Sequence, residues 1–239
     1  MNGKKARPFL PFFITMGIRT QGGMRARTER GLAMKVMLVN GSPHKDGCTN
    51  RALEEVAAAL REEGVDAEVF WIGGKPVGGC MGCGGCRKLG RCVYDDAVND
   101  FRQKAAEADG FVFGAPVHYA HAAGSLLGFM DRLFFSESAD LAHKPAAAVC
   151  SARRGGTTAS FDDINKFFTI NQMPVVSARY WNNVHGTCAE DVERDEEGLG
   201  NLRALGRNMA WLLRCIEAGR AAGIEPPADE DYPRTNFIR

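Results

Sequence analysis

The strongest constraint on this chain is a repeated pattern, in which a short apolar run is followed by a longer segment with apolar residues at helical spacing. The predicted strands cover residues 34–40, 67–72, 110–115, 144–151 and 174–178, and the predicted helices cover residues 48–63, 97–108, 122–135, 162–170 and 197–222. Strands that alternate with helices of this length pair in parallel, because each helix returns the chain to the same edge of the sheet. We therefore predict an α/β fold with a doubly wound, five-stranded parallel sheet and a ligand at the carboxyl ends of its strands.

Composition and charge exclude several classes of function. The chain has 239 residues, of which 45% are hydrophobic and 25% charged, as in ordinary globular proteins. A formal net charge of +1 gives no general attraction to nucleic acid or to an anionic membrane, so we expect neither as a partner. No apolar stretch is long enough to cross a bilayer and no segment resembles an export signal, which predicts a cytoplasmic protein.

Local composition predicts where the folded domain lies. Residues 1–33 are rich in basic side chains and precede the first predicted strand, so we expect a disordered extension there. We expect the folded domain over residues 34–224. Residues 225–239 contain several Pro and Asp residues and are expected to form a mobile or partner-docked tail.

A polar loop at residues 41–50 joins the first predicted strand to the first predicted helix. Backbone N–H groups at a helix N-terminus can bind phosphate, and polar side chains in the loop would add to the site. The candidate residues are Ser42, His44, Cys48, Thr49 and Asn50. The alternative is a plain N-cap, in which Thr49 or Asn50 satisfies the first turn without a ligand. The loop has neither the Walker motif nor the dinucleotide motif, which leaves the phosphate of a mononucleotide.

The order Gly-Ser-Pro-x-x-x-Gly-x-Thr at residues 41–49 resembles the FMN phosphate loop of the NADPH-dependent FMN reductase and iron–sulfur flavoprotein group. This group belongs to the flavodoxin-like superfamily, and the resemblance covers residues 34 to about 222. It implies a flavodoxin-like sheet with strand order 2-1-3-4-5. It also implies that FMN carries the redox chemistry with NAD(P)H as co-substrate, so no catalytic side chain is required.

Two further loops follow the third and fourth predicted strands and are expected at the same edge. The resemblance implies that the first of them wraps the flavin ring, through Pro116, Val117, His118 and Tyr119. The second contains Ser151, Arg153, Arg154, Gly155 and Gly156. Its backbone N–H groups or an arginine would stabilise negative charge on reduced flavin, or an arginine would meet the 2′-phosphate of NADPH. The alternatives are that Tyr119 is ordinary core and that the arginines lie in a solvated turn.

Four cysteines lie between the second predicted strand and its helix with the spacing C-x2-C-x2-C-x5-C. Thiols this close in a reducing compartment favour metal ligation over disulfides. The spacing is similar to the compact motif of the iron–sulfur flavoproteins, which implies that Cys80, Cys83, Cys86 and Cys92 hold a 4Fe-4S cluster. A loop of free thiols and a zinc site are the alternatives.

We therefore expect an FMN-dependent oxidoreductase that passes electrons from NAD(P)H to a quinone, a flavin, a nitro compound or a one-electron partner. The rival is an electron-transfer module without NAD(P)H turnover of its own, and a flavin-free interaction domain is a third possibility. The aromatic segment at residues 177–186 predicts a homodimer or homotetramer, because aromatic side chains are enriched at interfaces.

Overall fold

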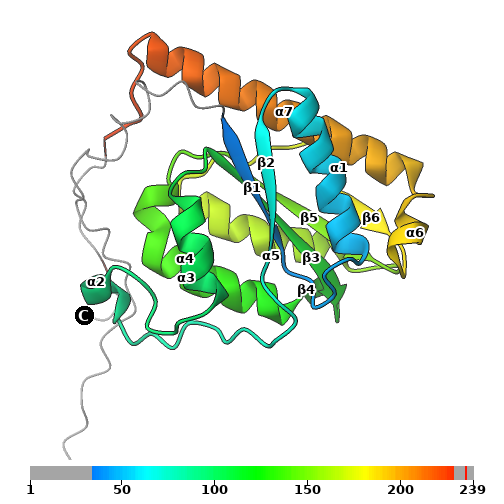
Figure 1. Ribbon diagram of the computed structural model, residues 1–239, viewed down its shortest axis with the longest axis horizontal. Helices are drawn as coiled ribbons and strands as arrows, with labels where there is room; N and C mark the ends of the chain where they lie inside the picture. The colour runs from blue at the N-terminus through cyan, green and yellow to red at the C-terminus, as the bar shows by residue number, and fades with distance from the viewer. Residues whose placement is uncertain (1–33, 229–234, 236–239) are drawn as a thin grey trace, which may run out of the picture.

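The computed structural model describes residues 34–228 and residue 235. The predicted extension at residues 1–33 and most of the predicted tail therefore lie outside the described residues. Seven helices and six strands follow one another along residues 34–228 (Figure 1). The strands are β1 (Lys35–Asn40), β2 (Asp66–Trp71), β3 (Gly110–His118), β4 (His121–Ala122), β5 (Ala146–Ala152) and β6 (Asn183–His185). The helices are α1 (Cys48–Glu62), α2 (Cys86–Leu89), α3 (Ala97–Ala105), α4 (Gly124–Leu141), α5 (Thr157–Ile170), α6 (Ala189–Val192) and α7 (Glu196–Ala221).

The sheet has the order β2-β1-β3-β5-β6, and all of these neighbours pair in parallel. The short strand β4 lies off this path and pairs with β3 in an antiparallel hairpin. When the five parallel strands are numbered along the chain, their order is 2-1-3-4-5. The predicted flavodoxin-like, doubly wound sheet is confirmed.

Each strand divides its side chains between two cores, because successive residues point to opposite faces of a sheet. On β1, Met37 and Val39 pack into the core under α3, α4 and α5, whereas Val36 and Leu38 pack under α1 and α7. Figure 1 shows α1 and α7 on one side of the sheet and α3 and α4 on the other. Burial on both faces explains why β1, β3 and β5 read as continuous apolar runs.

The fifth predicted strand is wrong in its position. Residues 174–178 make only one isolated bridge, between Ala146 and Val175, and the edge strand of the sheet is β6. The cause is Asn201 of α7, whose side-chain oxygen accepts hydrogen bonds from the backbone N–H groups of residues 179 and 180 at 3.1 and 2.9 Å. These backbone groups are directed to a helix and not to β5. The buried Asn182 then donates from its side chain to Ala148 O at 3.1 Å, which returns the chain to the sheet.

None of the helices in residues 34–228 combines the length and the apolarity that crossing a bilayer requires. All eight cysteines lie in this part of the chain and are free thiols. The other element boundaries differ from the predicted ones mainly at helix ends. The largest differences are that α4 continues to Leu141 and that α5 begins at Thr157.

Candidate functional site

The loop at residues 41–50 is shaped by Asn40, the last residue of β1, whose side chain is fully buried. Its amide nitrogen donates to Lys45 O at 3.0 Å and to Asn50 Oδ1 at 3.2 Å, and its oxygen accepts from Ser42 N at 3.0 Å. One amide therefore connects both ends of the loop to the sheet. The sequence analysis did not identify Asn40, although a polar residue that ends a buried strand is a usable signal.

The N-terminus of α1 has no side-chain cap. Its N-cap residue is Gly47, no side chain hydrogen-bonds there, and the first turn contains no acidic residue. Thr49 is buried, and its hydroxyl lies 2.8 Å from the hydroxyl of Ser151 instead of capping the helix. The plain N-cap alternative is therefore wrong. The first-turn N–H groups and the positive end of the helix dipole are open to an anion.

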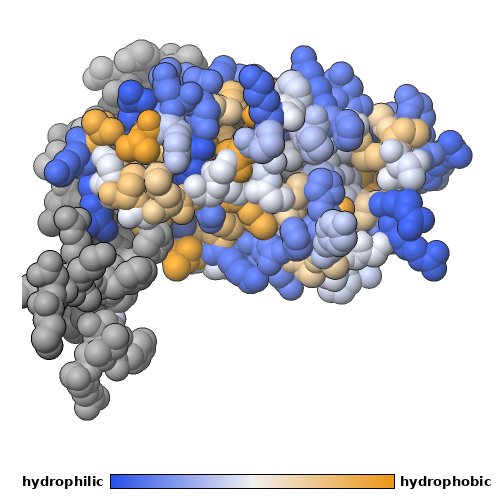
Figure 2. Space-filling view, turned by 90° about the horizontal axis from the view of Figure 1, so that it is seen from below, coloured by the Kyte–Doolittle hydropathy of each residue, from blue (hydrophilic) through white to orange (hydrophobic). Residues whose placement is uncertain are grey.

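The three candidate segments converge at the carboxyl ends of β1, β3 and β5, a surface that we call the flavin edge: residues 41–50, 116–119 and 151–156. Gly41 N donates to Gly114 O at 2.9 Å, and Pro116 lies opposite Ser151 in the β3–β5 register. Figure 2 views the molecule from below, where these strands end in Figure 1, and shows several apolar patches among hydrophilic side chains.

Gly156 brings the third segment against the second. It has φ of +94°, and a Cβ placed there would lie 2.7 Å from Ala120 Cα and 2.8 Å from Val117 Cγ1. Only glycine accepts both this backbone conformation and this close approach. The N-terminus of α5, where Gly156 is the N-cap, also has no side-chain cap and no acidic residue in its first turn.

Tyr119 lies at the tip of the β3–β4 hairpin with its side chain 99% exposed, so the alternative that it is a core residue is wrong. Tyr119 and Ala120 have φ of +51° and +63°, a conformation that is uncommon for residues other than glycine. Non-glycine residues in this conformation cluster at ligand sites.

The remaining candidates of the flavin edge are mostly exposed at the surface. His44, His118, Arg153 and Arg154 are exposed, and within the described residues no ion pair involves either arginine. Cys48 points from the start of α1 toward α6, with its Sγ 3.2 Å from Cys188 O. Burial raises the pKa of the Cys48 thiol. The individual roles of these residues toward FMN stay predictions.

The four clustered cysteines line one pocket of about 350 Å³, solvent space included, which we call the cysteine pocket. Cys80 and Cys83 come from an irregular loop, Cys86 begins α2, and Cys92 precedes α3. Burial, with Cys80 nearby, raises the pKa of the Cys86 thiol. The pocket wall also contains Met81, Val93, Tyr94, Arg132 and Phe135.

The donor set of the cysteine pocket fits an iron–sulfur cluster, because cysteine thiolates are its usual protein ligands. No group of three or more His, Cys, Asp or Glu side chains within the described residues is arranged around one metal position. A tetrahedral zinc ion needs its four sulfurs close together, whereas a four-iron cubane holds its ligand sulfurs farther apart. The four thiols line one pocket, and four cysteine thiols are the donor set that an iron–sulfur cluster uses.

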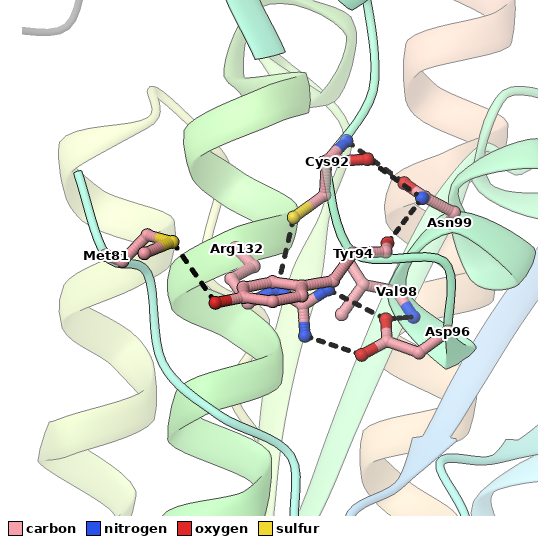
Figure 3. Close-up of polar contacts among 7 residues, drawn as sticks. All are labelled: Met81, Cys92, Tyr94, Asp96, Val98, Asn99 and Arg132. Carbon is pink, nitrogen blue, oxygen red and sulfur yellow. Dashed lines mark hydrogen bonds and ion pairs between the residues drawn. The ribbon is translucent and has the colours of Figure 1, made fainter. Parts of the chain in front are cut away.

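Two side chains from neighbouring helices fix the cysteine pocket, and neither was identified from the sequence (Figure 3). Asn99 of α3 donates to Cys92 O at 3.0 Å and to Tyr94 O at 2.7 Å, and it accepts from Cys92 N at 3.0 Å. Arg132 of α4 donates from Nε to Cys92 Sγ at 3.2 Å and from its two terminal nitrogens to Asp96 at 2.7 and 2.8 Å. Burial alone would lower the pKa of Arg132, but the hydrogen bonds to Asp96 and Cys92 raise it above its ordinary value.

Helix α4 joins the two sites. Its N-cap residue Ala123 donates to Pro116 O of the flavin edge at 3.1 Å. One turn later, a Cβ at Gly128 would lie 2.7 Å from Val77 O, so a glycine is needed where the loop that leads to Cys80 crosses the helix. Arg132 follows one turn after Gly128.

Comparisons with known proteins agree with this arrangement. A family model described as NADPH-dependent FMN reductase matches residues 34–187. An iron–sulfur flavoprotein of Methanocaldococcus jannaschii is 32% identical over 192 residues, which cover 77% of this chain and 100% of the relative. An iron–sulfur flavoprotein of Methanosarcina thermophila is 26% identical over 193 residues, which cover 78% of this chain and 99% of the relative.

Solved structures show the same fold at low sequence identity. RosB, solved with bound 8-demethyl-8-formylriboflavin-5′-phosphate, has a TM-score of 0.61 at 15% identity and covers 87% of this chain and 93% of its own. An archaeal flavodoxin has a TM-score of 0.51 at 18% identity and covers 76% of this chain and 99% of its own. The chain is therefore a flavin-dependent oxidoreductase of the NADPH-dependent FMN reductase family, and within it belongs with the iron–sulfur flavoproteins.

Proposed function

We propose that this protein is an NAD(P)H oxidoreductase that binds FMN at the flavin edge and passes electrons on to an acceptor. The observation that carries the proposal is the convergence of three loops at one edge of the sheet, joined by the hydroxyl contact between Thr49 and Ser151 at 2.8 Å. In doubly wound sheets, ligands bind at this edge, where the direction of winding reverses. Bound FMN would accept a hydride and release electrons singly or in pairs.

The residues of the chain would bind and orient the flavin. The uncapped N-terminus of α1 offers N–H donors to the phosphate, with Ser42 held in the same loop by Asn40. The β3–β4 hairpin offers backbone groups to the polar edge of the ring. Arg153 and Arg154 are exposed beside this edge and are suited to the 2′-phosphate of NADPH, because guanidinium groups bind phosphate in a bidentate manner.

An open groove adjoins the hairpin and gives an entry route for a co-substrate or an acceptor. It has about 1030 Å³ of space, open solvent included, and lies between α4 and α5 with His121 of β4 at its wall. Its lining combines apolar side chains, Leu127, Phe167 and Ile170, with Asp131, Asp163 and Lys166. Quinones, flavins and nitro compounds are flat and largely apolar, with polar edges, so their chemistry fits this lining.

The test of the proposed reaction is anaerobic purification followed by an absorption spectrum and stopped-flow mixing with NADH and with NADPH. We expect a flavin spectrum that bleaches with at least one of the two nucleotides. Colourless protein would overturn the flavin assignment. Flavin that neither nucleotide bleaches would favour the second candidate, an electron-transfer module, which the separate cysteine pocket beside the flavin edge also supports.

We also propose that Cys80, Cys83, Cys86 and Cys92 hold a 4Fe-4S cluster that exchanges single electrons with the flavin. Iron and sulfide analysis of anaerobic protein tests this, with Cys86→Ser as the variant and the exposed Cys215→Ser as its control. We expect Cys86→Ser to lose iron with FMN retained, and Cys215→Ser to keep both. Wild-type protein without iron or sulfide would overturn the cluster.

The aromatic segment after residue 177 supports the proposed homo-oligomer. Tyr180 and Trp181 are 61% and 49% exposed, and their rings stack edge to face with centroids 4.6 Å apart. Two exposed aromatic side chains held together favour a protein interface. Light scattering at micromolar concentration should show a dimer or tetramer that Trp181→Ser weakens, and a wild-type monomer would contradict this.

A further inference from the structure

The four thiols of the cysteine pocket have unequal surroundings. Cys80 and Cys86 contact only backbone groups, Gly82 N at 3.5 Å and Phe135 O at 3.9 Å. Cys92 instead accepts a hydrogen bond from a charged guanidinium, with Arg132 Nε at 3.2 Å from its sulfur. Figure 3 shows this contact between the loop before α3 and the helix α4. The sulfur of Cys92 therefore differs electrostatically from those of Cys80 and Cys86.

Arg132 is fixed in place for this contact. Its side chain is 2% exposed, and both terminal nitrogens bond the carboxylate of Asp96 at 2.7 and 2.8 Å. The ring of Tyr94 covers the guanidinium at 4.9 Å from the ring centroid, and the Tyr94 hydroxyl donates to Met81 Sδ at 3.1 Å. A buried, doubly bonded guanidinium cannot turn away from the sulfur, and exclusion of water strengthens its field.

Asp96 is fixed in turn, because it is the N-cap of α3 and accepts from Val98 N at 3.2 Å. The arrangement therefore extends from one helix terminus through Arg132 to the sulfur of Cys92.

We propose that Arg132 raises the reduction potential of the iron–sulfur cluster by donating to the sulfur of Cys92. The inference rests on the proposed cluster, and it adds a positioning residue that determines how readily the cluster accepts an electron. Positive charge and a hydrogen bond at a ligand sulfur stabilise the more negative, reduced state. The asymmetry places this effect on Cys92, whereas the sulfurs of Cys80 and Cys86 hydrogen-bond with backbone groups.

The test compares Arg132→Gln with Arg91→Gln as a matched control. Arg91 lies next to Cys92 in sequence and pairs with Asp95 at 3.3 Å, but that pair is exposed and does not touch a sulfur. Iron and sulfide are first measured in all proteins, and the cluster is then titrated anaerobically with detection by electron paramagnetic resonance. The FMN midpoint potential in each sample is the internal reference for general changes in the fold.

We expect R132Q to shift the cluster to more negative potential, with at least a tenfold change in its oxidised-to-reduced ratio at a fixed poise. Tenfold corresponds to about 59 mV for one electron. We expect the cluster potential of R91Q, and the FMN midpoint potential of both variants, to shift much less. Arg132→Met is measured beside R132Q, because methionine lacks both the charge and the N–H donor, whereas the amide nitrogen of glutamine lies at nearly the same chain position as Arg132 Nε.

A second pair of variants separates the hydrogen bond from net charge. Asp96→Asn removes the negative charge, and Asn is an equally good N-cap for α3. If net charge alone sets the potential, the double variant D96N/R132M returns to the wild-type value. We expect it to stay below wild type, because the donor to the sulfur is still missing.

Three outcomes would overturn the inference. Wild-type protein without iron would remove the cluster and this inference together. Iron-loaded R132M with a wild-type cluster potential would overturn the inference alone and leave the cluster standing. A double variant that returns fully to the wild-type potential would assign the effect to charge and not to the bond at Cys92.

Discussion

The flavin edge and the cysteine pocket are both in contact with α4 but are built in different ways. Backbone register builds the flavin edge, since its three segments leave neighbouring strands and are joined by the contact of Gly41 N with Gly114 O. The cysteine pocket comes from a long irregular segment with a single short helix, α2, and depends on two side chains, Asn99 and Arg132. A site set by a sheet is present before its ligand arrives, whereas a site held by side chains depends more on each contact and on its ligand.

Substitution of Asn99 should give the largest difference in local stability between the two sites. Asn99→Ala removes three hydrogen bonds to residues 92 and 94, and at roughly 1 kcal/mol each the local cost is about 3 kcal/mol. We expect faster amide hydrogen exchange over residues 80–96 and little change in β1, measured by mass spectrometry. Asn208→Ala, which removes one exposed bond to Ser177 O, is the control. Equal loosening of β1 would show that the two sites are not independent.

Gly156 tests whether the flavin edge depends on close backbone contact. Gly156→Ala would place a Cβ 2.7 Å from Ala120 Cα at φ of +94°, whereas Gly64→Ala, at φ of +75°, meets nothing within 4 Å. Both variants carry the cost of a left-handed residue, and only the first adds overpacking, about 2 kcal/mol. Urea unfolding measures the difference. Equal destabilisation by the two substitutions would mean that the hairpin moves aside freely.

Thr49 tests the contact between the first and third segments. Thr49→Val keeps the shape of the side chain but leaves the buried Ser151 hydroxyl without its partner at 2.8 Å. The expected cost of about 1.4 kcal/mol weakens FMN binding roughly tenfold, as measured by fluorescence titration of apoprotein. The exposed Thr169→Val should leave the affinity unchanged. An unaltered Kd for FMN in T49V would mean that this contact does not contribute to FMN binding.

The Cys150 thiol should affect the pH dependence of stability only above neutral pH. Burial raises the pKa of this β5 thiol to about 12, above its value in the unfolded chain. The folded state therefore retains a proton that the unfolded state loses, so stability is full below about pH 8.5 and decreases as pH rises toward 12. Above about pH 8.5, the free energy of unfolding should decrease with pH more steeply in the wild type than in Cys150→Ala, by up to about 1.4 kcal/mol per pH unit. Parallel curves for the two proteins would mean that water reaches the thiol.

The sequence predicts the regions whose pattern is local. β1, β3 and β5 are buried on both faces and read as apolar runs, and the loops that follow them carry recognisable polar residues. The edge strand was misplaced because its position depends on Asn201, a residue of α7 that takes the backbone groups of residues 179 and 180. The sequence near residues 174–178 contains no pattern that indicates this contact with Asn201.

The cysteine pocket could be predicted only in part, for the same reason. The spacing of the four cysteines is visible in the sequence, but the contact of Arg132 with Cys92 joins residues 40 positions apart and depends on how α4 is turned. The one signal was the charged pair Asp131-Arg132 within the otherwise apolar stretch at residues 126–135. A charge in such a stretch indicates a buried partner, although it does not say which one.

Helix α4 has a consequence for the timing of electron transfer. It contacts the flavin edge at Ala123 and the cysteine pocket at Arg132, and the nine residues from Gly124 to Arg132 span about 12 Å along its axis without a break. A continuous helix has no hinge, so a flavin and a cluster bound at its two ends would be held at a fixed separation. Electron transfer between the two sites would then require no movement of a segment. The rate of this internal step should therefore not depend on solvent viscosity.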